Sequence, residues 1–156
     1  MGGRGDKQPG GYTVDESGNV SISSAEGLAW LANQSQNDNY YRKTVTLTAD
    51  IDQSAHNWAP IGPSSNDFRG TFDGQNHTIT GLTIDGCSTY AGMFANIYDG
   101  AVRNVRLAEC SITRTSTYTA GICGYNSSGT IENCHVLSGS IHGRQQAGGI
   151  CGGRRL

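Results

Sequence analysis

Apolar and polar residues alternate with a period of two along most of this 156-residue chain, which is the pattern of half-buried β-strands. Residues 12–22 give two short runs of this kind around the turn-forming Ser17-Gly18-Asn19. From residue 58 onward the chain has no helical period, and short strands joined by Gly- and Asn-containing turns are predicted. The longest alternating run is residues 43–52, whose apolar positions are Val45, Leu47, Ala49 and Ile51.

One segment, residues 24–36, breaks this alternation and predicts an amphipathic α-helix. Ser24 is suited to be its N-cap, because a serine hydroxyl accepts a hydrogen bond from a free N–H of the first helical turn. Trp30 lies beside the apolar stripe and is expected to pack at its edge. The stripe itself has helical spacing and consists of Ala25, Leu28, Leu31 and Ala32.

The last third of the chain repeats itself, with a period of about 29. An earlier segment, Thr78–Ile84, resembles Ala101–Leu107 at a shorter shift, which is 23. A period of this length without helices is typical of a β-solenoid with about three short strands in each coil. The predicted fold class is therefore all-β, a β-solenoid of the parallel β-helix type with one α-helix. The matched segments are Gly100–Leu107 with Gly129–Val136, Ala91–Ile97 with Ala120–Asn126 and, at a shift of 28, Ala120–Cys123 with Gly148–Cys151.

Each coil is expected to bend at a fixed position. Asn133 interrupts the alternation of its strand, and Asn104 occupies the equivalent place one repeat earlier. Gly81 is predicted to occupy the place before that, because asparagine and glycine both tolerate turn conformations. The inward-pointing residues around Asn133 are predicted to be Ile131, Cys134 and Val136.

The cysteines are expected to fill the narrow core. Stacked coils place equivalent residues ~4.8 Å apart, so Cys123 and Cys151 are predicted to lie one above the other, after Phe94. Buried free thiols are favoured as small apolar fillers. A Cys123–Cys151 disulfide stays open, because that Cα separation lies within the bonding range. The five cysteines, which include no CxxC pair and so predict no zinc site, are Cys87, Cys110, Cys123, Cys134 and Cys151.

We expect a single domain. Residues 1–11 are predicted to be a flexible tail, 12–57 an N-terminal capping region with the helix, and 58–156 the repeat coils, of which the last is incomplete. One coil buries too little apolar surface to offset the ordering of its backbone, so coils must stack and their ends need covers. The helix is predicted to close the N-terminal end. The incomplete last coil predicts either a fragment of a longer protein or end-to-end self-association through the open C-terminal coil.

A short motif, which is a glycine, a Leu-like residue, a hydrophobic residue and a glycine, is found at Gly121–Gly124 and Gly149–Gly152. Together with Trp58–Ile84, these segments resemble the GLUG-motif repeats of bacterial surface proteins. An earlier copy departs from the motif, with Ala95 in place of the last glycine. The resemblance implies a right-handed parallel β-helix, exported or displayed on the bacterial cell surface. Similar repeats occur in adhesin-like proteins and beside immunoglobulin-cleaving metallopeptidase domains, and no catalytic residues are carried over with them.

Charge and hydropathy exclude some partners. A net charge of −2 and a pI of about 6.0 give no reason to expect a nucleic-acid partner. No apolar run approaches the ~18–20 residues that a membrane-spanning helix needs, so no membrane span is predicted. No apolar stretch typical of a signal peptide follows Met1. The secreted or cell-surface location is therefore expected from the resemblance alone.

Four tyrosines are the candidate ligand-binding residues. Tyr90 and Tyr118 are nearly one repeat apart, so stacking of the coils would place them in a short aromatic ladder on which a sugar can pack. The alternative interpretation is that all four tyrosines cover the corners of the coils. The predicted partner is a glycan or a host surface protein. The four residues are Tyr90, Tyr98, Tyr118 and Tyr125.

The alternative class is a carbohydrate-active enzyme of the β-helix type, either a polysaccharide lyase or a glycoside hydrolase. A glycosidase needs two carboxylates ~5–9.5 Å apart, whereas the acids here are scattered along the sequence. Asp50 and Asp52 offer fewer oxygens than the about six to eight of a calcium site. No catalytic residue, metal site or cofactor is predicted, and a non-catalytic scaffold or adhesin module is favoured.

Two residue pairs receive structural interpretations. His77, near Asp73 in the sequence, is interpreted as a turn histidine rather than a general base. Arg103 and Glu132 are equivalent in the repeat and are expected to form a surface salt bridge, which typically contributes ~0–1 kcal/mol.

Overall fold

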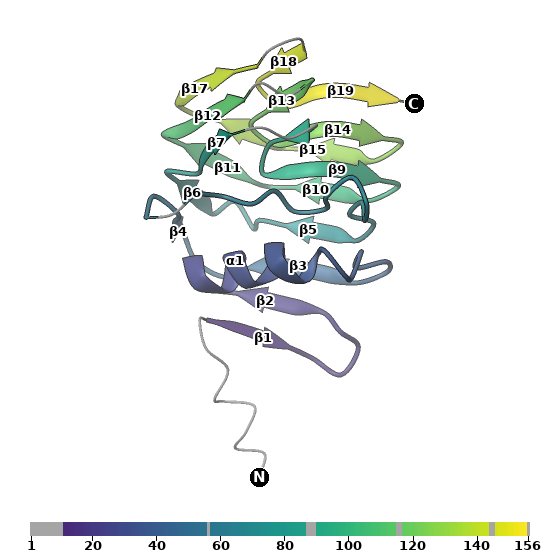
Figure 1. Cartoon of the computed structure of the whole chain (residues 1–156). Coiled ribbons are helices and arrows are strands. Elements are labelled where there is room, and N and C mark those ends of the chain that lie inside the picture. Colours follow the sequence, from purple (N-terminus) through teal and green to yellow (C-terminus); the bar gives the residue numbers. More distant parts are fainter. Residues whose placement is uncertain (1–10, 56, 87–89, 115–116, 144–145, 156) are drawn as a thin grey trace.

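The computed structural model describes residues 11–155, except residues 56, 87–89, 115–116 and 144–145. The described part of the chain is a β-solenoid of about 4 turns with one α-helix (Figure 1). Its strands form five sheets that run along the stack, and neighbouring strands in each sheet come from successive coils. The paired strands are parallel, apart from the antiparallel pair β1 (Tyr12–Val14) and β2 (Val20–Ile22) at the N-terminal end.

The remaining strands are distributed over the five sheets. The first sheet continues from β2 through β3 (Thr44–Leu47), β5 (Thr71–Asp73), β10 (Ala101–Arg103) and β15 (Thr130–Glu132). The second contains β4 (Ile51–Asp52), β6 (Thr78–Thr80), β11 (Arg106–Ala108) and β16 (His135–Val136). The third contains β7 (Thr83–Gly86), β12 (Cys110–Arg114) and β17 (Gly139–His142). The fourth contains β8 (Tyr90–Ala91), β13 (Tyr118–Ala120) and β18 (Gln146–Gly148), and the fifth β9 (Phe94–Tyr98), β14 (Cys123–Ser127) and β19 (Cys151–Arg155).

The strand register confirms the repeat that the sequence predicted for the last third of the chain. Val102 pairs with Ile131, and Cys123 pairs with Cys151, as the matched segments require. The shorter shift predicted between Thr78–Ile84 and Ala101–Leu107 is wrong. Leu107 pairs with Ile79 rather than with Ile84, so the earlier coils have nearly the same length as the later ones.

Two extra residues lie in the turn between β5 and β6. Four residues, 74–77, connect these strands, whereas β10 and β11 are connected by Asn104 and Val105 alone. This turn changes the shift between the two coils by two residues, from 30 at Thr71–Ala101 to 28 at Thr78–Arg106. The shift of 23 arose because the sequence match aligned the corner at Gly81 with a different corner, at Asn104. The repeat is therefore continuous in space where the sequence suggests a break.

Asparagines with left-handed backbone conformations stack at one corner of the coils. Asn76, Asn104 and Asn133 have φ values of 63°, 59° and 51°. The Asn133 amide donates hydrogen bonds to Oδ1 of Asn104 at 2.7 Å and to Oδ1 of Asn76 at 3.1 Å. The shared bend of Asn104 and Asn133 is confirmed, but Gly81 belongs to the next corner. There it aligns with Glu109, and both have positive φ, 78° and 53°.

The asparagine corner predicts a specific loss of stability. We expect Asn104→Ala to lower the free energy of unfolding by about 2 kcal/mol, because alanine pays ~1–2 kcal/mol in the left-handed region and the amide ladder is interrupted. Asn104→Gly is the matched control, since glycine adopts this φ freely and loses only the amide. Urea denaturation of both variants measures the difference. Equal stabilities would show that the backbone conformation is not the cause.

Apolar side chains fill the interior of the stack. Phe68, Phe72 and Phe94 are fully buried and adjacent, with ring centroids 5.1 Å apart for Phe68–Phe94 and 5.4 Å for Phe72–Phe94. The residues predicted to point inward in the later coil, Ile131, Cys134 and Val136, pack against this core and are partly buried. Their equivalents one coil earlier are fully buried: Val102, Val105 and Leu107.

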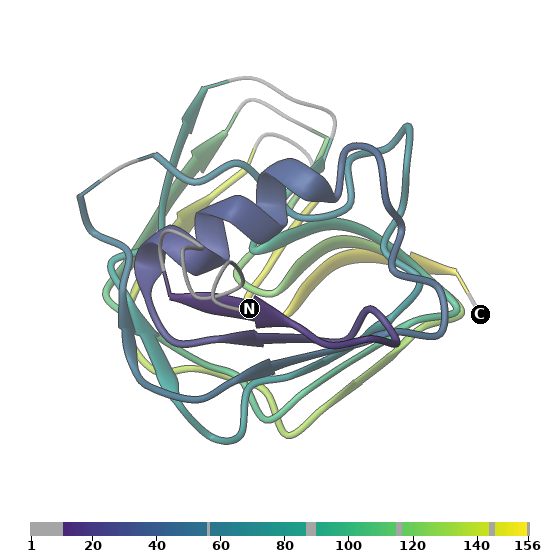
Figure 2. The same cartoon turned by 90° about the horizontal axis from the view of Figure 1, so that it is seen from below.

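The predicted helix is confirmed as α1 (Ala25–Gln34), with its C-terminal end two residues before the predicted one. Ser24 is the N-cap, and its hydroxyl accepts a hydrogen bond from the Gly27 amide at 3.3 Å. Trp30 stacks on Tyr12 with ring centroids 3.7 Å apart. The helix lies beside β3 and above β1 and β2 in Figure 1, and seen from below it crosses in front of the coils (Figure 2). The stripe packs inward as predicted: Leu28, Leu31 and Ala32 are buried and Ala25 is partly buried.

Buried hydrogen bonds tie the end of α1 to the following coil. The Ser35 hydroxyl donates to the Ala32 carbonyl at 2.7 Å and accepts from the Gly62 amide at 3.1 Å. Asn66 donates to the Ser35 carbonyl at 2.9 Å. Isolated bridges from Ile61 to Phe94 and from Phe68 to Ile97 then place residues 61–68 against β9.

Two predictions concern residues at the edge of the described part. Residues 1–10 of the predicted tail lie outside it, and the carbonyl of Gly11 accepts a hydrogen bond from the Ser23 amide at 2.8 Å. Cys87 also lies outside the described residues. The other cysteines are free thiols, as favoured: Cys110 and Cys123 are buried, and Cys134 and Cys151 are half-buried.

Candidate ligand-binding site

Three of the four candidate tyrosines form one cluster on the side of the stack. Tyr90 on β8 pairs with Tyr118 on β13, which confirms the predicted ladder. Tyr125 comes from β14, beyond the corner that follows β13. Its ring lies 5.5 Å from Tyr90 and 5.0 Å from Tyr118, and the Tyr90–Tyr118 distance is also 5.5 Å, all between ring centroids. We call Tyr90, Tyr118 and Tyr125 the tyrosine cluster.

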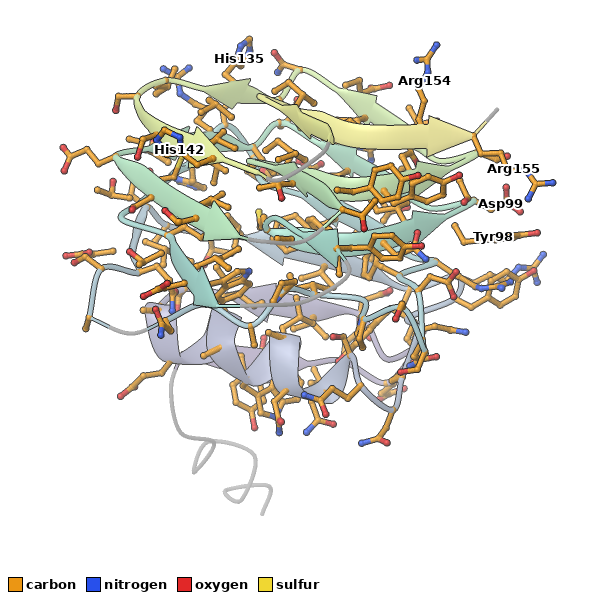
Figure 3. All side chains as sticks on the ribbon, turned by 45° about the horizontal axis from the view of Figure 1, so that its top comes forward. Tyr98, Asp99, His135, His142, Arg154 and Arg155 are labelled. Carbon is orange, nitrogen blue, oxygen red and sulfur yellow. The ribbon has the colours of Figure 1, made fainter. Side chains whose placement is uncertain are left out.

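Tyr98 does not belong to this cluster. Its ring is 40% exposed and is covered by the Arg69 guanidinium, whose carbon lies 4.3 Å from the ring centroid. Figure 3 shows Tyr98 projecting from the edge of the stack beside Asp99, on the side where Arg155 ends β19. Tyr98 therefore forms a separate cation–π contact, and its part in a common site with the other three tyrosines stays a prediction.

A column of polar residues continues from Tyr125 along the stack. Asn96 pairs with Tyr125 one coil earlier, and Asp67 lies against Asn96 on the side away from Tyr125. The Asn96 amide donates to the Asp67 carboxylate at 3.3 Å. Asn96 is only 9% exposed, and its Oδ1 has no hydrogen-bond partner. This oxygen is a buried acceptor beside the aromatic rings, and such an atom is usually paired in a folded protein.

Sequence analysis missed Asn96 and Asp67, although the repeat contains the signal. Asn96 stands one repeat before Tyr125, and Asp67 stands one repeat before Asn96. The predicted ligand site rested on tyrosines, and Asp67 was counted only among the scattered acids, so neither residue was placed beside Tyr125.

Two glycines make room for the cluster. A β-carbon on Gly153, which pairs with Tyr125 in the next coil, would lie 2.5 Å from the ring of Tyr118. A β-carbon on Gly124 would lie 3.0 Å from that of Tyr90. The ring of Tyr118 therefore occupies space that a side chain on Gly153 would fill, and Gly124 lets the backbone that carries Tyr90 approach closely.

The cluster is polar as well as aromatic. All three rings are half-buried, so each keeps some contact with solvent. Burial raises the pKa of the Tyr90 hydroxyl, and Tyr118, Tyr125 and Asp67 raise it further. Tyr90 is therefore protonated at neutral pH and is able to donate a hydrogen bond. Half-buried aromatic rings with a few convergent polar groups are typical of a binding site for a small polar ligand.

The residues considered for enzymatic chemistry lie apart from the cluster and bond to other groups. His77 Nδ1 lies 3.1 Å from Asp50 rather than beside Asp73. Asp50 has its pKa lowered by the hydrogen bond from the Thr78 amide, and then by His77, so it is a poor general acid.

Asp73 and Asp52 bond locally. Asp73 accepts hydrogen bonds from Arg103 at 3.4 Å and from Asn104 at 3.0 Å. The salt bridge of Arg103 is therefore with Asp73, and the expected pairing with Glu132 is wrong, although the two residues are in register. Asp52 accepts from the Ser54 hydroxyl at 2.5 Å.

A cavity of about 490 Å³ lies between α1 and the segment after β4, away from the tyrosine cluster. Gln53 lines it, is 3% exposed and has an Oε1 without a hydrogen-bond partner. Glu26 is the one carboxylate among the described residues that line this cavity, so it does not offer the two acids that a glycosidase requires. The other lining residues are Ala25, Ala29 and Ala55.

The described residues contain neither a cluster of metal ligands nor a helix that could span a membrane. No group of three or more His, Cys, Asp or Glu side chains is placed to bind a metal ion within residues 11–155, leaving aside the gaps given above. In the same part of the chain no helix has the length and apolar character needed to cross a bilayer.

The fold and the cluster define a class: a β-solenoid repeat protein with an aromatic surface site. The chain is 34% identical over 134 residues to halomucin of Haloquadratum walsbyi, an alignment that covers 76% of this chain and 1% of halomucin. It is also 35% identical over 98 residues, 61% of this chain and 11% of the relative, to a protein of Evansella cellulosilytica named as a Gly-rich membrane protein. The chain thus spans a small part of either relative. No family model matches the chain, and no solved structure matches it.

Proposed function

We propose that this chain is a non-catalytic β-solenoid module of an exported protein, where it serves as a scaffold or adhesin and binds a glycan through the tyrosine cluster. The main support for this proposal is that three tyrosine rings lie together, with centroids 5.0–5.5 Å apart, at the end of the Asp67–Asn96 column. The same surface would also serve a host protein that presents a sugar-like polar face.

The chemistry of a sugar fits what the cluster offers. The C–H face of a pyranose is apolar and packs against aromatic rings, which contribute ~0.5–1.5 kcal/mol beyond the buried area in aromatic pairs. Its hydroxyls can donate to the half-buried Asp67 carboxylate, which lies beside Asn96 in the same column.

The names of the relatives support an exported location. One relative is a mucin by name and the other a membrane protein by name. The GLUG resemblance of Gly121–Gly124 and Gly149–Gly152 points the same way, and we propose that these segments are GLUG-type repeats of a surface protein. Both relatives are many times longer than the aligned region, which suits a module repeated within a large protein.

Three further parts of the proposal concern the stack. We infer right-handed winding, because about 98% of crossovers between parallel strands of one sheet are right-handed. We infer that α1 caps the N-terminal end, because its buried stripe of Leu28, Leu31 and Ala32 covers apolar residues there. End-to-end association through the last coil stays a prediction, for which sedimentation at several concentrations is the measurement.

The glycan-binding proposal predicts the effect of one substitution. We expect Tyr118→Ala to weaken binding of the best oligosaccharide on a glycan array at least tenfold, about 1.4 kcal/mol, because it removes one of three rings that all contact one another. Isothermal titration with that oligosaccharide measures the change. Tyr41→Ala is the matched control, since Tyr41 is 61% exposed and lies outside the cluster.

Two results would contradict the proposal. If the Tyr118 and Tyr41 variants bind equally well, the tyrosine cluster is not the binding site. If a reducing-sugar assay shows turnover of the bound oligosaccharide, the chain is a carbohydrate-active enzyme and not a binding module. Circular dichroism of both variants verifies that the solenoid is intact.

A further inference from the structure

Two cysteines of adjoining coils lie side by side at the start of the last strands. Cys123 begins β14 and Cys151 begins β19, and the two are direct partners in the parallel register. The Cys123 thiol donates to the Tyr125 carbonyl at 3.0 Å and the Cys151 thiol donates to the Gly153 carbonyl at 2.8 Å, so the two sulfurs occupy equivalent places on adjoining strands. Neighbouring strands are ~4.8 Å apart, and disulfides join Cα atoms ~4.4–6.8 Å apart. We propose that Cys123 and Cys151 are a modification site, which reacts with a low-molecular-weight disulfide to form a cross-link between the last two coils.

The two thiols are unequal, and this assigns their roles. Cys123 is fully buried, and burial first, then the neighbouring Cys151, raises its pKa. Cys151 is half-buried, and its pKa is lowered to about 7, chiefly by the neighbouring Cys123 side chain. The positive charge of Arg154, on the same strand, also lowers the pKa of Cys151 and so favours its thiolate. Cys151 is therefore the attacking thiolate, and Cys123 is the resolving thiol.

The reaction is a balanced thiol–disulfide exchange. The Cys151 thiolate attacks one sulfur of the small disulfide, forms a mixed disulfide at Cys151 and releases the first small thiolate, which takes up a proton. The Cys123 thiol then gives up its proton and attacks the Cys151 sulfur, which forms the Cys123–Cys151 bond and releases the second small thiolate. The two cysteines are oxidised by two electrons, and the small disulfide is reduced to two thiols.

The other described cysteines lack such a partner. Cys110 pairs with Gly139, and burial raises its pKa. Cys134 donates hydrogen bonds to the carbonyls of Val102 and Glu132, and burial raises its pKa as well. The cross-link does not depend on glycan binding, so the tyrosine cluster and the cysteine pair are tested separately.

The test is incubation of the full chain with oxidised glutathione, followed by intact-mass measurement and peptide mapping without reductant. We expect a Cys123–Cys151 disulfide and no stable glutathione adduct. Cys123→Ser should trap one glutathione on Cys151, because the resolving thiol is absent. Cys151→Ser should leave Cys123 unmodified, and the matched control Cys134→Ser should react like the wild type. The initial rate should rise about fivefold from pH 6 to pH 7 and about twofold from pH 7 to pH 8, following the thiolate fraction.

Three outcomes would overturn the proposal. They are a wild-type chain that keeps both thiols free, a disulfide mapped to another pair, and equal labelling of Cys123 and Cys151 in the two serine variants. A Cys151→Ser variant that fails to fold does not affect the test, because trapping of glutathione in Cys123→Ser and the wild-type map each decide it alone.

Discussion

Phe94→Ala is expected to lower the free energy of unfolding by about 3–5 kcal/mol. Phe94 is fully buried and touches two other buried rings, Phe68 and Phe72. Its backbone also connects three coils, because it pairs with Ile61 on one side and with Cys123 on the other. The substitution thus opens a cavity where the stack depends on side chains from neighbouring coils.

Chemical denaturation of the wild type and two variants tests this expectation. Phe94→Leu is the control, because it keeps much of the apolar volume and should cost about 1–1.5 kcal/mol. The alanine variant should also weaken glycan binding, since Asn96 lies two residues further along the same strand. If the alanine variant is as stable as the leucine variant, the interior near β9 is not close-packed and the shared-core account of the coils is wrong.

The later coils were predictable because they keep their length. Val102, Ile112 and Cys123 each find an apolar or sulfur-containing partner one repeat further on, so the sequence alone predicts which residues stack. The earlier coils were not predictable in this way. The apolar pattern around Gly81, between β6 and β7, resembles the pattern around Asn104, between β10 and β11, so the sequence match aligned two different corners of the coil.

The helix was predictable for a different reason. Its signals are local: Ser24 supplies the cap and the spacing of Leu28, Leu31 and Ala32 supplies the buried stripe. The position of the helix relative to the coils depends on distant contacts, such as the hydrogen bond from the Gly62 amide to the Ser35 hydroxyl. No pattern within residues 24–36 contains that information.

The candidate site was also predictable only where its residues lie one repeat apart. Tyr90 and Tyr118 were paired correctly because a single repeat separates them. Tyr125 follows Tyr118 by seven residues, and only the corner between β13 and β14 brings the two rings within 5.0 Å. Tyr98 was grouped with them because it is also a tyrosine near a turn, but Arg69 covers it instead. Corner geometry, which the sequence does not specify, decides membership of the cluster.

Leu31→Asp is expected to have an effect as large as that of Phe94→Ala, but in a different part of the stack. Leu31 is fully buried on the inner side of α1, and an uncompensated buried charge costs about 3–5 kcal/mol. In a solenoid each coil contacts only its neighbours, so loss of the proposed cap should weaken the nearest coils most. Native-state hydrogen exchange measures this, because it reports an opening free energy for each amide.

The expected pattern is graded along the stack. Opening free energies should fall by about 3–5 kcal/mol for amides of β2 and β3 and by clearly less for amides of β14 and β19. Ala29→Asp introduces the same carboxylate on the exposed side of the same helix and should change protection by less than about 1 kcal/mol. If the amides of β2 and β3 have the same opening free energies in both aspartate variants, α1 does not cap the stack. An equal loss in every coil would mean that the solenoid unfolds as one cooperative unit, in which the cap stabilises distant strands as strongly as near ones.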